Sequence, residues 1–157
     1  MGAGKTTVGR TLARKRGFDF IDLDELIETQ AGKSVEQIFA ELGEDEFRRL
    51  ESETLKSCAE LERMIISLGG GAYISEENRR IVKMAGISVL LDCPIEVCIS
   101  RVSYDGSRPL LGQESEVRAL YDKRLPYYRL ADHTISSGED SPEEIADKII
   151  VLLAEKK

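Results

Sequence analysis

The chain has 157 residues, which is the length of one ordinary domain with a single hydrophobic core. With 22 basic and 29 acidic side chains its formal charge is -7, and no basic stripe indicates a nucleic-acid partner. Its apolar stretches, such as residues 149–154, fall far short of the roughly 20 residues that cross a bilayer. These features, with no signal-peptide pattern at the N-terminus, predict a cytoplasmic protein without membrane contact.

The cysteine and histidine content gives little support to a disulfide or a metal site. Cys58, Cys93 and Cys98 have no C-x-x-C spacing, and we interpret them as small buried hydrophobic residues. His133 is the only histidine in the sequence, so the chain lacks the ligands that a zinc site requires.

The chain opens with a glycine-rich segment that is typical of phosphate binding. Gly2-Ala3-Gly4-Lys5-Thr6-Thr7 matches the second half of a Walker A loop, G-x-x-x-x-G-K-[ST], whose first glycine would precede Met1. Backbone N–H groups at the N-terminus of a helix would cradle an anion, Lys5 would contact the outer phosphates, and the Thr6 hydroxyl would bind Mg2+. The segment predicts a nucleotide-dependent phosphoryl-transfer protein.

The following residues predict a helix, a strand and a helical insertion. The helix covers residues 7–16 and is closed by Gly17, and an alternating strand over residues 18–22 delivers Asp22 and Asp24 at its carboxyl end. Open α/β sheets bind ligands at that end of their strands. A helix over residues 24–30 is followed by one that begins with a capping box at Ser34 and stops at Gly43, and by a third over residues 44–61. We expect this insertion, about residues 24–61, to form a substrate-binding subdomain.

Residues 64–68 form an apolar run that predicts a buried parallel strand ending at Gly69-Gly70-Gly71, where a partner must approach the backbone closely. A helix capped by Ser75, a second buried strand over residues 87–91 and a short helix to residue 102 follow. Turn-forming residues predict a mobile lid over about residues 103–113.

The remaining residues predict two helices and a strand. The helix over residues 115–130 should be kinked or interrupted by Pro126, the strand covers residues 132–136, and Ser141 with its capping box begins the last helix. Alternating strands and helices predict a parallel sheet with helices on both faces. No linker or repeat is present, so we expect one domain over residues 1–157.

The whole series of motifs resembles shikimate kinase, a small P-loop kinase similar to the nucleoside-monophosphate kinases. The resemblance extends from Gly2 to about Leu130. Its pieces are the opening M-G-A-G-K-T-T-V-G, Asp22-x-Asp24, Ile38-Phe39 followed by Gly43-Glu44, Phe47-Arg48-x-x-Glu51, Gly69-Gly70-Gly71, Arg108-Pro109-Leu110-Leu111 and Arg124-x-x-Tyr127-Tyr128-Arg129. It implies an α/β P-loop NTPase sandwich of three layers with a parallel sheet. It also implies transfer of the ATP γ-phosphate to the 3-hydroxyl of shikimate, in aromatic amino-acid biosynthesis.

The resemblance further implies which residues bind the substrate. Arg48 and Arg124 would hold the shikimate carboxylate through their planar guanidinium groups. Asp24 would accept hydrogen bonds from the ring hydroxyls and orient or deprotonate the attacking one. Gly69, Gly70 and Gly71 would let a backbone N–H group reach the substrate where a side chain would collide.

On the nucleotide side, the resemblance implies that residues 2–7 hold ATP. Thr6 and Asp22 would hold Mg2+, the latter through water. Arg108 in the lid would close over the phosphates, and Arg101 would pack against the adenine ring. Three residues are expected to act in catalysis: Asp24, Lys5 and Arg108. The predicted partner is a small-molecule substrate, and we expect a monomer.

Several alternatives stay open. A glycine triplet is often a simple turn, and an arginine pair such as Arg48-Arg49 is usually an exposed helix face. Glu51 would hold Arg48 by an i,i+3 pair or touch the ligand. Two rival functions are another small-metabolite P-loop kinase of the gluconate kinase type, and a noncatalytic nucleotide-binding relative.

The incomplete Walker A loop leads to a hypothesis about the start of the chain. Many relatives have a methionine at the position of Met1, so we expect Met1 to be an internal methionine, preceded in the biological protein by about ten residues that include a first strand. The resemblance places that strand centrally, between the strands at residues 64–68 and 87–91. Because a central apolar strand contributes on the order of 10 kcal/mol, we expect the chain as given to fold poorly alone.

Overall fold

The computed structural model describes residues 2–105 and 114–154. The chain divides into two compact units, one combining residues 1–12 with residues 88–157 and the other comprising residues 13–87. Helix α1 (Lys5–Arg16) begins in the first unit and ends in the second, where Gly17 closes it with a φ of 63°. Among the described residues, no helix combines the length and the apolar character needed to cross a membrane.

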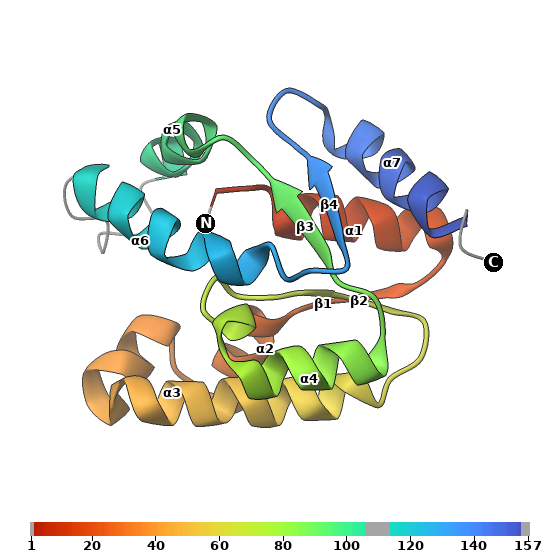
Figure 1. Ribbon diagram of the computed structural model, residues 1–157. Coiled ribbons are helices and arrows are strands. Elements are labelled where there is room, and N and C mark those ends of the chain that lie inside the picture. The colour runs from red at the N-terminus through yellow and green to blue at the C-terminus, as the bar shows by residue number, and fades with distance from the viewer. Residues whose placement is uncertain (1, 106–113, 155–157) are drawn as a thin grey trace. The chain divides into compact units, whose positions relative to one another are not determined.

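Two parallel strands organise the second unit. Strand β1 (Asp19–Asp22) pairs with β2 (Met64–Ser67), and Asp22 lies opposite Ser67 at their carboxyl ends (Figure 1). Helix α2 (Leu23–Ala31) starts directly after β1, and the glycine triplet starts two residues after β2. The parallel register therefore brings the first turn of α2 to the glycine triplet.

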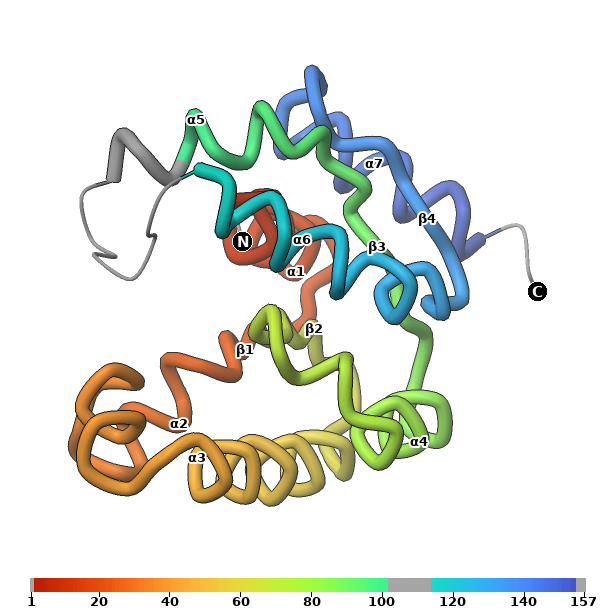
Figure 2. The backbone as a smooth tube through the Cα atoms, turned by 60° about the vertical axis from the view of Figure 1, so that its left-hand side comes forward, coloured from red at the N-terminus to blue at the C-terminus, as the bar shows by residue number. Residues whose placement is uncertain are grey.

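The helical insertion consists of α2 and α3 (Val35–Ala59). The Ser34 hydroxyl accepts the Gln37 N–H while the Gln37 side chain accepts the Ser34 N–H, which confirms the predicted capping box. At Gly43 the backbone leaves the helical region with a φ of 86°, so the two predicted helices form one helix with a kink. Helix α3 lies along α2 and along α4 (Glu76–Ala85), which is preceded by the short η1 turn (Ala72–Ile74) (Figure 2).

The first unit contains the second strand pair. Strands β3 (Val89–Asp92) and β4 (His133–Ser136) are parallel, and α7 (Pro142–Ala154) contacts β4. Ser141 and Glu144 form the predicted capping box at the start of α7. Helix α5 (Ile95–Asp105) packs against α6 (Glu114–Tyr128). The predicted interruption of α6 is wrong, because Pro126 lies in its last turn, where the missing N–H removes little of the helix.

The strands are less buried than their apolar composition predicts. Most residues of β2 and β3 are half-buried. In the described residues each of these strands pairs with one neighbour only, in the orders β1-β2 and β3-β4, so one edge of each lacks a partner strand. In the described residues the strands thus form two two-stranded sheets, whereas the sequence predicts one parallel sheet. Cys58, Cys93 and Cys98 are free and buried, as predicted.

The core of the second unit joins α2 to α3. Its central side chains are at most 3% exposed, and they are Leu23, Ile27, Ile38, Phe47 and Leu55. They come from the inward faces of two amphipathic helices, so the insertion is held by apolar burial rather than by the strands.

We expect Ile27→Ala to lower the free energy of unfolding by about 2–4 kcal/mol, because it removes a side chain that is 1% exposed and leaves a cavity. Urea denaturation followed by circular dichroism measures the loss. Leu42→Ala, at a helical position that is 50% exposed, is the control and should change stability by less than about 0.5 kcal/mol. Equal effects of the two variants would contradict the assigned core.

Candidate active site

The glycine triplet lies between an acid and an arginine in the second unit. A Cβ atom on Gly69 would collide with the carboxylate of Asp24, and a Cβ atom on Gly71 would collide with the guanidinium of Arg48. A side chain at either position would therefore displace the Asp24 carboxylate or the Arg48 guanidinium. The turn brings together three of the elements that carry predicted substrate-binding residues: the start of α2, the middle of α3 and the segment after β2.

Two carboxylates and two aromatic rings hold Arg48. Its Nη1 lies 3.0 Å from Glu51 Oε2, and its Nη2 lies 3.2 Å from Glu44 Oε1. The guanidinium also lies 5.3 Å from the ring centre of Phe47 and 5.9 Å from that of Phe39. Glu51 is 1% exposed, so the i,i+3 pair fixes Arg48 from the protein interior.

The charge of Arg48 is stabilised despite its partial burial. Desolvation acts to lower the pKa of Arg48, but the carboxylates of Glu51 and Glu44 outweigh it and raise the pKa above the usual value. A fixed, half-buried guanidinium beside a turn without side chains is suited to bind a planar carboxylate, because its fork of N–H donors matches two oxygens.

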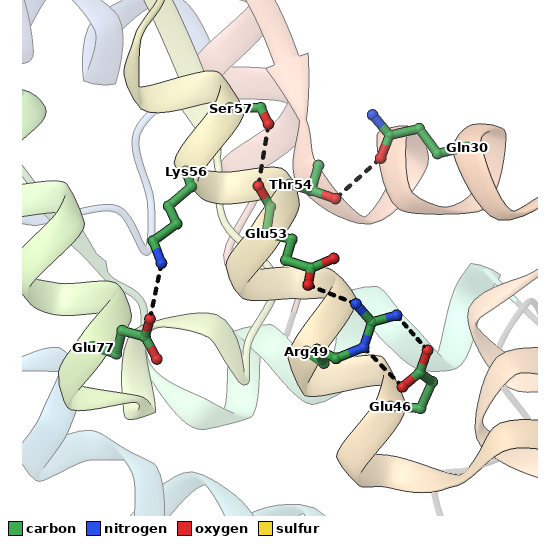
Figure 3. A network of polar contacts seen from close by, with 8 residues as sticks. All are labelled: Gln30, Glu46, Arg49, Glu53, Thr54, Lys56, Ser57 and Glu77. Carbon is green, nitrogen blue, oxygen red and sulfur yellow. Dashed lines mark hydrogen bonds and ion pairs between the residues drawn. The ribbon is translucent and has the colours of Figure 1, made fainter.

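The neighbouring Arg49 pairs with two glutamates of α3, Glu46 and Glu53 (Figure 3). Its guanidinium is 2.6 Å from Glu46 Oε1 and 2.6 Å from Glu53 Oε1, and its side chain is 53% exposed. The exposed-face interpretation of the arginine pair thus applies to Arg49, whereas Arg48 faces the glycine turn.

Asp22 and Asp24 differ in role although they are two residues apart. Asp22 Oδ1 accepts the N–H of Asp24 at 3.2 Å and so caps α2. A carboxylate has about four lone-pair sites, so a helix cap by itself occupies only part of its acceptor capacity. Asp24 is half-buried in the first turn of α2, where its side chain contacts Gly69.

The phosphate cradle forms the N-terminus of α1 in the first unit. Gly2 and Gly4 have φ of 68° and 83°, left-handed values that favour glycine, and a Cβ atom on Gly2 would also collide with the Cys98 carbonyl. Lys5 and Thr6 follow in the first turn of a helix whose last turn is basic. Both the helix dipole and Lys5 favour an anion here.

Arg101 of α5 lies next to this cradle. Its Nη1 is 3.4 Å from the Gly2 carbonyl oxygen, and its Nη2 is 3.4 Å from that of Gly138, the loop after β4. Burial, followed by the neighbouring Cys93 thiol, raises the pKa of Cys98 to about 11, so this thiol stays neutral. Arg101 therefore adds positive charge beside the glycine-rich segment at Gly2.

For two other predicted site residues, Arg124 and Arg108, the described part of the structure gives no contact that bears on the predicted role. Arg124 is half-buried on α6 in the first unit, and no described contact tests its predicted role. Arg108 and most of the predicted lid lie outside the described residues. In the described ranges, no group of three His, Cys, Asp or Glu residues could hold a metal.

Two residues that support the glycine turn were missed by the sequence analysis. Asn78 donates to the Ala72 carbonyl, and Arg79 donates to those of Tyr73 and Ile74. The sequence signals these two residues only by their position in the first turn of α4, shortly after residues 72–74.

A glycine-rich loop that opens a helix, in a chain of parallel strands connected by helices, defines a P-loop kinase of the α/β class. The family model described as shikimate kinase matches residues 1–154. The shikimate kinase of Ruegeria pomeroyi is 42% identical over 161 residues, covering 100% of this chain and 83% of the relative. That of Thermodesulfovibrio yellowstonii is 39% identical over 153 residues, covering 96% and 88%.

A solved structure is also similar. The shikimate kinase from Acinetobacter baumannii in complex with shikimate superposes with a TM-score of 0.93 at 38% identity, over 99% of this chain and 90% of that one. The chain belongs to the shikimate kinase family, an assignment that confirms the resemblance, the fold class and the kinase activity predicted from the motifs.

We expect Gly71→Ala to raise the KM for shikimate about tenfold or more, because the new Cβ must displace the Arg48 guanidinium. Steady-state kinetics at saturating ATP measure this effect. Gly86→Ala is the control, since Gly86 has an extended backbone and no atom near the position of a Cβ. An unchanged KM in Gly71→Ala would show that the contact does not shape the site.

Proposed function

We propose that the protein transfers the γ-phosphate of ATP to the 3-hydroxyl of shikimate, giving shikimate 3-phosphate and ADP. The observation that carries the proposal is the convergence of Asp24 and Arg48 on the glycine turn, in a chain of the shikimate kinase family. The product is consumed in chorismate and aromatic amino-acid biosynthesis.

The second unit supplies the substrate side of the reaction. Arg48 binds the carboxylate, and Arg124 is a second candidate for the same acid. Asp24 accepts hydrogen bonds from the ring hydroxyls, and the backbone of Gly69, Gly70 and Gly71 approaches the ring. The fixed position of Arg48 supports this assignment, because a preorganised guanidinium loses little freedom when it binds.

The first unit supplies the nucleotide side. Residues 2–7 cradle the ATP phosphates, with Lys5 on the outer ones, and Arg101 packs against the adenine. Arg108 neutralises charge during transfer.

Mg2+ is assigned to the Thr6 hydroxyl and the Asp22 carboxylate. The donor set fits, because Mg2+ prefers oxygen ligands, retains several waters and is usually held by one or two protein groups. When bound, the ion neutralises phosphate charge.

Phosphoryl transfer depends more on the positions of the reacting groups than on a strong base. Phosphoryl transfer has a loose transition state, so Asp24 orients the attacking hydroxyl and takes its proton without requiring a raised pKa.

The two rival functions are weaker. Lys5, Asp22 and Asp24 are all present in the described residues, which speaks against a noncatalytic relative. A gluconate-type kinase shares the cradle and the strand-end acid, but the family match favours shikimate. We further propose that the enzyme acts as a monomer in the cytoplasm, since its three cysteines are free and its net charge is -7.

A coupled ADP-release assay tests the proposal with shikimate and gluconate as acceptors. We expect activity with shikimate only. Activity with gluconate alone would reverse the choice of substrate, and no turnover with either would favour the noncatalytic alternative.

We expect Arg48→Lys to lower kcat/KM for shikimate about 10- to 100-fold, because an ammonium keeps the charge next to Glu51 but cannot form the planar fork. Arg49→Lys is the matched control, on the neighbouring residue that pairs with Glu46 and Glu53 at the surface, and should act like the wild type. Equal losses in both variants would refute the distinction between the two arginines.

A further inference from the structure

Helix α4 holds the backbone of the η1 turn through two consecutive side chains. Asn78 Nδ2 donates to the Ala72 carbonyl oxygen at 3.0 Å. Arg79 Nη1 donates to the carbonyl oxygens of Tyr73 at 2.9 Å and of Ile74 at 2.6 Å. Three successive peptide groups after the glycine triplet are thus fixed from one element.

The environment of Asn78 is unusual for a residue that only stabilises the fold. Its side chain is 1% exposed, and its Oδ1 is buried with no hydrogen-bond partner among the described residues. A buried acceptor without a partner costs free energy that an apolar side chain of similar size would avoid. The Nδ2 donor, in contrast, is matched to one carbonyl group. The side chain is therefore better suited to fix that carbonyl than to fill the interior.

The fixed carbonyl is connected to the substrate side of the site. Ala72 is 0% exposed, and its N–H donates to the Gly69 carbonyl at 3.2 Å. The Gly71 carbonyl accepts the Ile74 N–H at 3.1 Å. Because glycines restrict the backbone least, the positions of Gly69 against Asp24 and of Gly71 against Arg48 depend on such external contacts.

We propose that Asn78 is a positioning residue for shikimate: through the Ala72 carbonyl it sets the distance of the glycine turn from Asp24 and Arg48. The inference rests on the proposed function. Asn78 does not touch the reacting groups itself. It acts on the affinity for the acceptor substrate and leaves the nucleotide side, which belongs to the other unit, unaffected.

The test compares Asn78→Leu with the wild-type enzyme in the ADP-release assay. Leucine has a similar size and removes both the donor to the Ala72 carbonyl and the buried Oδ1 that has no partner among the described residues. We expect the KM for shikimate to rise about tenfold, with kcat and the KM for ATP within about twofold of wild type. Isothermal titration should show a similar weakening of shikimate binding. Asn78→Ala, which leaves room for water, gives the second variant should Asn78→Leu fail to fold.

Two control variants distinguish an effect on the position of the glycine turn from a general loss of stability in the second unit. Glu77→Gln changes the neighbouring residue of α4, whose carboxylate pairs with Lys56 of α3 at the surface (Figure 3). Thr54→Val removes the buried hydroxyl that donates to Gln30 at 3.1 Å, a bond of the same unit that links α3 to α2 (Figure 3). Both should keep the wild-type KM for shikimate, whatever their melting temperatures.

The outcomes are distinct. An unchanged KM for shikimate in folded Asn78→Leu or Asn78→Ala would overturn the inference alone. The same holds for equal rises in the KM values of shikimate and ATP, or for a Thr54→Val variant that matches the Asn78 variants. A wild-type protein that does not phosphorylate shikimate would overturn the proposed function, and this inference with it.

Discussion

The close approach of the glycine turn to Asp24 and Arg48 is the constraint on which the substrate side of the protein depends. The parallel register that sets Asp22 opposite Ser67 makes the first turn of α2 and the segment after β2 neighbours. A Cβ on Gly69 or Gly71 would overlap the Asp24 carboxylate or the Arg48 guanidinium and force it to move. The strand register, the start of α2 directly after β1 and the glycines after β2 thus together place the Asp24 carboxylate and the Arg48 guanidinium beside the same turn.

The two units differ in their electrostatics. In the first, a helix N-terminus, Lys5 and Arg101 create a positive environment that favours an anion, and the nearby Cys98 thiol stays protonated. In the second, the charge of Arg48 is kept in place by a buried glutamate, and its own desolvation is outweighed by that pairing. Holding these charges before the substrate arrives reduces the reorganisation that binding and transfer require.

The features that were predicted correctly from the sequence are those that depend on residues close together in the chain, such as helix caps and strand ends. The capping boxes at Ser34 and Ser141, the break at Gly43 and the strand ends at Asp22 and Ser67 depend on nearby residues, and they were predicted correctly apart from shifts of a residue or two. The burial of β2 and β3 was predicted incorrectly, because it depends on how many neighbours each strand has in the sheet. The hold of Asn78 on Ala72 was missed, because an asparagine in a helix does not reveal which carbonyl it meets. Arg48 was distinguished from Arg49 by family resemblance, and the partners of each side chain supply the physical reason.

The most direct measurement is a crystal structure of the protein with shikimate bound. The account predicts the carboxylate of shikimate in a two-point contact with the Arg48 guanidinium and a ring hydroxyl on the Asp24 carboxylate, with the backbone of residues 69–71 against the ring. Shikimate bound elsewhere, or bound with Arg48 still turned to its carboxylate partners alone, would contradict it.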